Sequence, residues 1–427
     1  MHRFAYKGRE LYCENVAVSR VAREVGTPFY LYSIGTFLDH YRKLKEAFRG
    51  ADPLICFSVK ANSNLTVLNA LVAAGSGLDI VSGGELHRAK AVGVDPRKVV
   101  FASVGKTESE IEGAVRAGIL MFNVETPQEL DVINTVACRL KTTQKVAIRL
   151  NPDVAPDTHH YITTGSKQTK FGIDRENAYK IFMESYRYPF LRFAGVHVHI
   201  GSQITNARPF IQAIKKALEF IDSVRYNGNP VEYLNIGGGL GIIYSKEKPQ
   251  TARQFADAVL PLFRRYDLKH GLKIILEPGR FISGNSGILV TRAIYQKRTP
   301  TKSFVIVDAG MNDLIRPSLY GAHHEILPVI RRSGKKTYEN VDVVGPVCES
   351  GDFLAKDRKL RSVEVGDLLA VMSCGAYGFV MSSNYNSRPR VPEVVVRGSR
   401  FFVARRRETF EDLLRGERIV REAAGHP

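Results

Sequence analysis

The chain has 427 residues, of which 44% are hydrophobic and 24% are charged, and this composition excludes a collagen, a disulfide scaffold and a disordered tail. At roughly 100 to 200 residues per domain, the length predicts two domains. The formal net charge of +18 would favour anionic partners if it were gathered on one face, but the basic residues are dispersed, so no nucleic-acid partner is predicted.

The first two thirds of the chain alternate short apolar runs with stretches of helical periodicity, which is typical of β–α units. After a first segment of about 30 residues, the expected strands are 54–59, 78–81, 98–102, 120–124, 145–150, 193–198, 232–236 and 273–277. The expected helices include 64–74, 84–91, 107–117, 126–137, 208–226 and 251–266. Eight such units predict a closed (β/α)8 TIM barrel over residues 31–278, although a doubly wound open sheet would give the same pattern.

From about residue 279 the sequence becomes rich in strands and loops. The expected strands are 288–295, 304–308, 342–344, 368–373 and 394–403, the last broken by a turn at Gly398 and Ser399. Together with residues 1–30, residues 279–427 predict a second, mostly β domain with a C-terminal helix ending near residue 424. The longest connection within the predicted barrel, 151–172, exceeds the usual loop length and is predicted to be a functional loop.

The expected location is the cytoplasm. No apolar run approaches the ~20 residues that a membrane helix needs, and the first residues contain neither an apolar h-region nor a small-residue cleavage site. The 5 cysteines are widely separated and include no C-x-x-C pair. Neither a disulfide framework nor a structural zinc site is therefore indicated, and reduced thiols are expected.

A lysine ends the first predicted barrel strand. Barrel enzymes place their active sites at the C-terminal ends of the strands, which is where Lys60 falls. Partial desolvation there would favour the neutral amine, which can form a Schiff base with an aldehyde. A surface lysine that happens to follow a strand explains the position equally well.

Two histidines alternate at the end of the sixth predicted strand. His197 and His199 would share a face and could form a metal pair, but no third ligand follows at metal-site spacing, so no metal site is predicted. A better use for His199 is a ring that stacks on a flat ligand, with the Ser202 hydroxyl as donor to an anion. Either histidine could instead be an ordinary core residue.

Glycine-rich loops follow the seventh and eighth predicted strands. They contain Gly237, Gly238 and Gly239 after the seventh strand, and Glu277, Pro278, Gly279 and Arg280 after the eighth. Without a Cβ, glycine lets backbone N–H groups approach a phosphate closely, and barrels commonly bind phosphate with these two loops. The string is not a dinucleotide fingerprint because Ile242 stands where the last glycine would be. A tight turn remains the alternative.

An amine, a phosphate cradle, a partner for a flat ring and a carboxylate are the groups that pyridoxal 5'-phosphate requires. Lys60 would hold the aldehyde, and His199 would cover one face of the ring. The glycine loop, Ser202 and the backbone near Gly279 would hold the phosphate. Glu277 could keep the pyridine nitrogen protonated, so that the ring accepts the electron pair released when a bond at the substrate Cα breaks.

Eight motifs resemble those of diaminopimelate decarboxylases. They are SVKAN around Lys60, GLDIVSGGEL, HVHIGSQ, GGGLG, EPGR, MNDLIRPSLYGAHHE, GPVCESGD and GAYGFVMSSNYNSRPR, in the family's order. The resemblance implies decarboxylation of meso-2,6-diaminopimelate to L-lysine and CO2, the last step of lysine biosynthesis, with pyridoxal phosphate as cofactor. It also implies an alanine-racemase-like fold and a homodimer with shared active sites.

The resemblance further implies how the substrate is recognised. Arg280, Arg316 and Tyr320 would bind its distal carboxylate, and Glu349 would meet its distal ammonium. Two guanidinium groups can supply a bidentate carboxylate clamp, which suits a zwitterionic amino-acid end.

Three more residues are assigned by the resemblance alone. Cys348, from the partner subunit, would return a proton to Cα. Tyr377, also from the partner, would hydrogen-bond the phosphate and contact the substrate, and Asp79 would lie near the cofactor. Arg280 would likewise touch both cofactor and substrate.

Rival functions remain on sequence grounds. The first is another decarboxylase of this fold, acting on ornithine, arginine or carboxynorspermidine; Arg316 speaks against the ornithine enzyme, which reads a distal amine with an acidic residue. A racemase would carry a catalytic tyrosine in place of the CES segment. A non-catalytic pyridoxal phosphate carrier would be expected to lack Lys60 or Cys348, and both are present.

Overall fold

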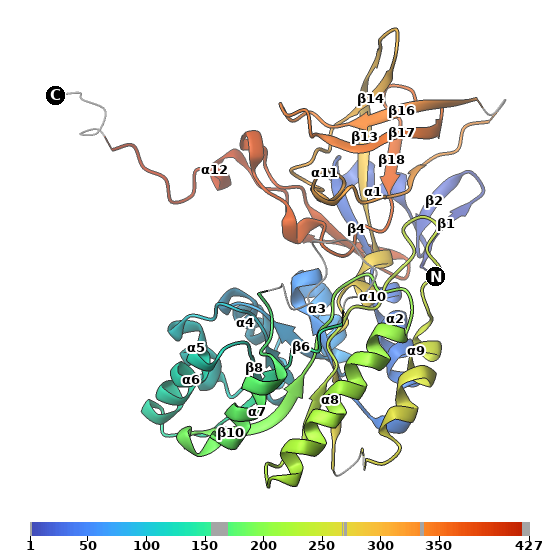
Figure 1. The fold of residues 1–427 in the computed structure, drawn as a ribbon. Helices are drawn as coiled ribbons and strands as arrows, with labels where there is room; N and C mark the ends of the chain where they lie inside the picture. Colours follow the sequence, from blue (N-terminus) through green and yellow to red (C-terminus); the bar gives the residue numbers. More distant parts are fainter. Residues whose placement is uncertain (1, 155–169, 267, 269–270, 334–336, 421–427) are drawn as a thin grey trace. The chain divides into compact units, whose positions relative to one another are not determined.

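A computed structural model describes residues 2–154, 170–266, 268, 271–333 and 337–420 (Figure 1). Its internal contacts divide the chain into two compact units. The barrel unit comprises Met1–Arg3, Ser33–Gly287 and Ser373–Val380, and the β unit comprises Phe4–Tyr32, Ile288–Met372 and Met381–Pro427. The segment Ser373–Val380 thus belongs to the barrel unit, although the chain has already left the barrel at Gly287.

Eight parallel strands close the barrel, in the order β10-β11-β12-β5-β6-β7-β8-β9. They are β5 (Leu54–Ser58), β6 (Gly77–Ile80), β7 (Val99–Phe101), β8 (Met121–Val124), β9 (Gln144–Arg149), β10 (Leu191–His197), β11 (Tyr233–Asn235) and β12 (Lys273–Leu276). All eight predicted strands are confirmed. The pairing of Ile275 in β12 with Leu54 in β5 closes the ring, so the open-sheet alternative is excluded.

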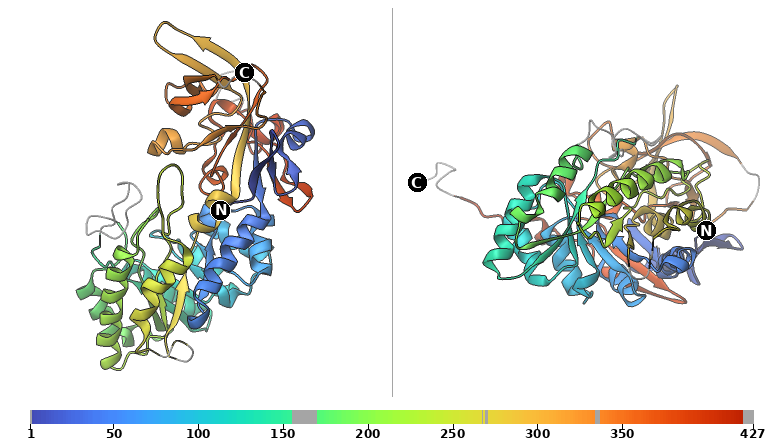
Figure 2. Two further views of the ribbon diagram at one scale, coloured as in Figure 1. Left: turned by 90° about the vertical axis from the view of Figure 1, so that its right-hand side faces the viewer. Right: turned by 60° about the horizontal axis from the view of Figure 1, so that its bottom comes forward.

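Helices form the layer outside the strands (Figures 1 and 2). They are α2 (Ile34–Ala47), α3 (Leu65–Ala73), α4 (Gly83–Ala91), α5 (Glu108–Ala117), α6 (Pro127–Arg139), α7 (Arg175–Met183), α8 (Arg208–Tyr226) and α9 (Ala252–Val259), with the short α10 (Arg280–Ser283) after β12. Several of their starts are capped: Thr107 and Glu110 form a capping box at α5, and Thr126 caps α6. Such caps satisfy N–H groups that the first helical turn leaves unpaired.

The β unit is built on a mixed sheet whose main path is β17-β16-β14-β13-β4-β19-β20, with β18 pairing β13 and β15. Its strands are β4 (Phe29–Ser33), β13 (Gly287–Arg298), β14 (Ser303–Val307), β15 (Ile326–Pro328), β16 (Tyr338–Val344), β17 (Phe353–Arg361), β18 (Leu368–Val371), β19 (Glu393–Arg397) and β20 (Arg400–Arg405). A three-stranded sheet of β1 (Phe4–Lys7), β2 (Glu10–Cys13) and β3 (Val16–Ala17), followed by α1 (Val18–Val25), completes it. The predicted fold class, a TIM barrel with a mostly β domain, is confirmed.

The C-terminal helix is shorter than predicted. Within the described tail that follows β20, only α12 (Phe410–Leu413) is helical. The expectation of a helix towards residue 424 is therefore wrong for the residues up to 420, and residues 421–427 lie outside the described ones. Gly416 has a φ of 86°, a left-handed conformation that ends a helix. The predicted functional loop also lies mostly outside the described residues, which omit 155–169.

Two further findings concern the cysteines and the helices. The 5 cysteines are all free thiols, as the sequence predicts. None of the helices in the described part of the chain is long and apolar enough to cross a membrane.

Candidate active site

Lys60 lies immediately after β5, in a short 3-10 turn (Val59–Ala61). Its Nζ is 3.0 Å from Oδ2 of Asp79, in β6, and Ser58 Oγ donates to the same oxygen at 2.7 Å. The Lys60 side chain keeps 36% of its surface exposed while that of Asp79 has none. The other oxygen, Asp79 Oδ1, is buried without a hydrogen-bond partner. The carboxylate therefore orients the lysine, whose side chain remains partly exposed.

The protonation of this pair is set by opposing effects. Burial disfavours the Lys60 ammonium, but the Asp79 and Glu277 carboxylates outweigh it and raise the pKa of Lys60 above its usual range. The expectation that desolvation favours the neutral amine is therefore wrong, because two carboxylates lie nearby. Burial and Glu277 raise the pKa of Asp79 to about 6. Lys60 must lose a proton before it can attack an aldehyde, and the hydrogen bond to Asp79 holds its nitrogen in place.

Glu277 follows β12 and is held by side chains from three other strands. Asn123 Nδ2 donates to its Oε1 at 2.9 Å and Asn235 Nδ2 donates to the same oxygen at 2.5 Å. His197 Nε2 lies 3.4 Å from Oε2. Burial opposes the charge of Glu277, but His197, Lys60 and Asn235 hold its pKa well below the usual range. The barrel thus presents an ionised carboxylate in a buried position.

Asn123, Asn235 and His197 are site residues that the sequence does not single out as such. The signal available was a polar side chain in or at the end of a short apolar strand, as in MFNV and YLN. The metal alternative for the two histidines gains no support, because no cluster of three or more metal-ligating side chains exists among the described residues.

His199 and the glycine triplet are in direct contact. Gly238 N donates to His199 Nδ1 at 3.2 Å. Burial, with the nearby charges of Arg149 and Lys60, lowers the pKa of His199 well below its usual range, so the imidazole is neutral. A neutral ring suits stacking on a flat ligand, the use that the sequence predicts.

The glycines are required by close backbone contacts. A Cβ on Gly237 would lie 2.7 Å from His199 Nδ1, one on Gly238 would lie 2.2 Å from the Glu277 carbonyl oxygen, and one on Gly239 would lie 2.5 Å from the Gly201 carbonyl oxygen. The triplet therefore lets the loops after β10, β11 and β12 converge.

Arg280 begins α10 beside Ser202. Its Nε donates to Ser202 Oγ at 3.1 Å, and its Nη1 donates to Tyr244 Oη at 2.6 Å. Its guanidinium carbon lies 4.9 Å from the centre of the Tyr377 ring. Gly279, which precedes Arg280, leaves no space for a side chain, because an added Cβ would lie 3.0 Å from Ala61 Cβ.

Tyr377 belongs to this chain's own barrel unit. Its N–H donates to the Ala61 carbonyl at 2.9 Å. The expectation that Tyr377 reaches the site from a partner subunit is therefore corrected: the segment Ser373–Val380 returns to the barrel and brings it to Arg280.

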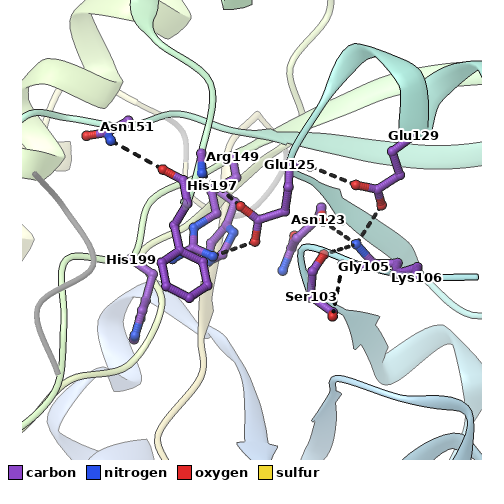
Figure 3. Close-up of polar contacts among 12 residues, drawn as sticks. Ser103, Gly105, Lys106, Asn123, Glu125, Glu129, Arg149, Asn151, His197 and His199 are labelled. Atoms are coloured by element: carbon purple, nitrogen blue, oxygen red, sulfur yellow. Dashed lines mark hydrogen bonds and ion pairs between the residues drawn. The ribbon is translucent and has the colours of Figure 1, made fainter. Parts of the chain in front are cut away.

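A buried ionic network supports this face of the barrel (Figure 3). Lys106, whose side chain is completely buried, pairs with Glu129 at 2.5 Å. Lys106 Nζ also donates to the Asn123 carbonyl at 2.9 Å. Because the Asn123 side chain holds Glu277, the ion pair fixes the strand end that positions the carboxylate.

The same network extends to the loop after β9. Glu129 accepts the N–H of Glu125 at 2.9 Å, and Glu125 pairs with Arg149 and accepts the N–H of Gly172 at 2.8 Å. The Arg149 guanidinium lies over the Phe171 ring, 4.6 Å from its centre. These contacts thus link the C-terminal ends of β8 and β9 to Phe171 and Gly172, which follow the long loop.

The remaining predicted site residues lie in the β unit. Arg316 and Tyr320 are the first and last residues of α11 (Arg316–Tyr320), and Arg316 is buried. Cys348 and Glu349 lie on the loop before β17 and are exposed.

The motifs that carry these residues are joined by hydrogen bonds. Ser318 Oγ, in α11, donates to the Gly351 carbonyl at 2.5 Å, and the N–H of Cys348 donates to Asn386 Oδ1 at 2.7 Å. Three distant motifs therefore come together within the β unit, whereas their roles towards the substrate remain predictions.

Comparison with known proteins decides the family. Residues 34–284 match the family described as pyridoxal-dependent decarboxylase, pyridoxal binding domain. A diaminopimelate decarboxylase of Aquifex aeolicus is 47% identical over 407 residues, covering 95% of this chain and 95% of that protein. This chain belongs to the diaminopimelate decarboxylase family. The resemblance seen in the eight motifs is confirmed.

Other members of the diaminopimelate decarboxylase family agree. The enzyme of Pseudomonas aeruginosa is 46% identical over 420 residues, covering 98% of this chain and 100% of that protein. The crystal structure of diaminopimelate decarboxylase from Helicobacter pylori complexed with L-lysine matches with a TM-score of 0.89 at 40% identity, covering 95% of this chain and 99% of that one.

Pyridoxal phosphate is the cofactor of this family, and the residues present fit it. A lysine amine, an ionised buried carboxylate and a neutral imidazole lie at the ends of β5, β12 and β10. The buried Asp79 Oδ1 has no hydrogen-bond partner in the described structure, which suits a site that gains polar groups on binding.

Proposed function

We propose that this chain is a pyridoxal phosphate-dependent decarboxylase that converts meso-2,6-diaminopimelate to L-lysine and CO2, the last step of lysine biosynthesis. One observation carries the proposal: a continuous chain of contacts joins the three groups that the cofactor needs. Lys60 donates to Asp79, which also accepts from Ser58, whose Oγ lies 3.0 Å from the Glu277 carbonyl. The N–H of Glu277 donates to the carbonyl of Gly237, next to the glycine that contacts His199.

When bound, pyridoxal phosphate supplies the electron sink that accepts the electron pair left by the departing carboxylate. Lys60 is the residue that would hold its aldehyde, with its amine oriented by the hydrogen bond to Asp79. Glu277, ionised and fixed by two asparagines, would accept a hydrogen bond from the pyridine nitrogen and keep it protonated. Neutral His199 would cover the ring without placing a second positive charge against the protonated pyridine nitrogen.

The phosphate would be held by the convergent loops. The N–H groups of Gly237, Gly238 and Gly239, the backbone near Gly279 and the Ser202 hydroxyl are its expected donors. The Tyr377 hydroxyl, which an added Cβ on Gly279 would approach to 3.5 Å, is a further donor from the same chain.

We assign substrate selection to three charged side chains and one tyrosine. Arg280, with Arg316 and Tyr320, would bind the carboxylate that the product retains, and Glu349 would bind the ammonium beside it. A zwitterionic distal end needs both signs of charge, whereas a simple diamine product would need only the acid.

The proposed assembly is a homodimer with shared active sites. Cys348 and Glu349 are exposed in the single chain, which leaves them accessible to a partner subunit's barrel. There Cys348 would return a proton to Cα, and Glu349 would meet the substrate ammonium. The proposed compartment is the cytoplasm, whose reducing conditions suit the 5 free thiols.

Carbon dioxide release from a panel of amino acids, with L-lysine quantified, tests the function. We expect CO2 and L-lysine in equal amounts from meso-diaminopimelate, and little CO2 from ornithine, arginine or carboxynorspermidine. The Lys60→Ala variant should lose both turnover and the visible absorbance of the lysine-linked cofactor, while Lys90→Ala, at an exposed lysine of α4, should keep both. Turnover of ornithine but not diaminopimelate, or racemisation without CO2, would contradict the proposal.

A further inference from the structure

Tyr244 holds the guanidinium of Arg280 together with two other side chains. Arg280 Nη1 donates to the Tyr244 hydroxyl at 2.6 Å and its Nε donates to Ser202 Oγ at 3.1 Å. The guanidinium carbon lies 4.9 Å from the centre of the Tyr377 ring. Arg280 itself is buried. Hydrogen bonds on two edges of the guanidinium and an aromatic ring against one of its faces fix the orientation of the guanidinium plane.

The backbone that carries Tyr244 is fixed in turn. Gln203 clamps Ile242 through both halves of its amide: Nε2 donates to the Ile242 carbonyl at 2.7 Å, and the Ile242 N–H donates to Oε1 at 3.1 Å. Backbone bonds between Ile204 and both Gly239 and Gly241, at 2.9 and 3.0 Å, continue the pairing. The loops after β10 and β11 therefore form one rigid support behind Arg280.

We propose that Tyr244 is a positioning residue for substrate selection, which fixes Arg280 for the carboxylate that is not lost in the reaction. This inference rests on the proposed function. An arginine reads a carboxylate through a planar pair of N–H donors, so its orientation decides the strength of the contact. The retained carboxylate is the same in substrate and product and far from the breaking bond. Tyr244 should consequently affect binding uniformly, so that its loss raises KM without lowering kcat.

The test is Tyr244→Phe, which keeps the ring and removes only the hydroxyl. Tyr266→Phe is the matched control, because its hydroxyl accepts a hydrogen bond from Arg265 at 3.0 Å and donates to Asp222 at 2.6 Å, in the same unit. Two ligands separate the possible effects. L-Lysine retains the carboxylate in question, whereas cadaverine (1,5-diaminopentane) is the diamine that remains when that carboxyl group is removed.

For Tyr244→Phe we expect KM for diaminopimelate and the calorimetric Kd for L-lysine to rise about 10-fold, since a hydrogen bond to a charged group is lost. The kcat should stay within about twofold, as expected for uniform binding, and the absorbance of the lysine-linked cofactor and the Kd for cadaverine should not change. Tyr266→Phe should match the original protein throughout.

Unchanged L-lysine binding in Tyr244→Phe would overturn the inference, as would equal losses for L-lysine and cadaverine or a fall in kcat alone. If the unaltered protein releases no CO2 from diaminopimelate, the proposed function fails and the inference with it. If that protein is active and Tyr244→Phe behaves like it, only the role of Tyr244 fails.

Discussion

Replacing Gly238 by alanine should damage the site through a backbone collision. The added Cβ would lie 2.2 Å from the Glu277 carbonyl oxygen, whereas ordinary contact begins at 3.4 Å. The two loops must therefore separate by about 1.2 Å. Gly238 is not among the glycines with positive φ, so the effect is steric alone. A shift of about 1 Å in a positioned catalytic group costs on the order of 100-fold in rate.

We therefore expect Gly238→Ala to lower kcat/KM for CO2 release about 100-fold and to weaken pyridoxal phosphate binding, measured by absorbance titration. Gly50→Ala is the matched control, because a Cβ there meets nothing within 4 Å, and it should behave like the original protein. The argument that the triplet lets these loops converge would be refuted if Gly238→Ala kept the pyridoxal phosphate affinity, the turnover and the thermal stability of the unaltered protein.

Three further outcomes are expected. Lys106→Met leaves Glu129 buried without its cation and should lower the free energy of unfolding, measured in urea, by about 3 to 5 kcal/mol. The double variant Lys106→Met with Glu129→Leu should recover most of that loss, and a single variant as stable as the unaltered protein would contradict the prediction. Burial raises the pKa of Glu85 to about 7, although a hydrogen bond from the Val81 N–H lowers it. The folded protein therefore holds this proton more tightly than the unfolded chain, whose Glu has a pKa of about 4.3. The stability that Glu85 contributes is fully present below that value and is lost as pH rises through 7. Urea unfolding of the cofactor-free protein should therefore show a smaller decline from pH 5 to pH 8 in Glu85→Gln, and identical declines would refute the assignment. Arg316→Ala should raise KM for diaminopimelate about 10-fold or more with little change in kcat, if it clamps a carboxylate; unchanged kinetics would remove Arg316 from the substrate site.

The sequence predicts the barrel well because its strands are short, apolar and buried, and because β–α alternation leaves few other folds. It also indicates Lys60, His199 and Glu277, since the ends of parallel strands meet on one face and these residues follow strands directly. The sequence does not predict which polar side chains contact one another at the ends of the strands. Asn123 bonds Glu277 across 154 positions of sequence, and no local pattern encodes that distance.

The corrections to the C-terminal helix and to Tyr377 have different physical causes. The sequence predicts a C-terminal helix ending near residue 424, but Gly416 adopts a left-handed backbone, and the described residues after it, up to 420, have no buried face to pack. The resemblance implies that Tyr377 comes from a partner, whereas the chain returns to its own barrel for the eight residues Ser373–Val380.

That return has a consequence for how the enzyme is made. Asn62 Nδ2 donates to the Gly375 carbonyl at 3.0 Å, and a Cβ on Gly375 would lie 2.0 Å from the Ser283 carbonyl oxygen, so the segment is seated tightly. During translation the ribosome completes all eight barrel strands long before it reaches this segment. A nascent barrel, or a product of premature termination before residue 373, would carry Lys60 yet lack Tyr377, and would remain an unfinished enzyme.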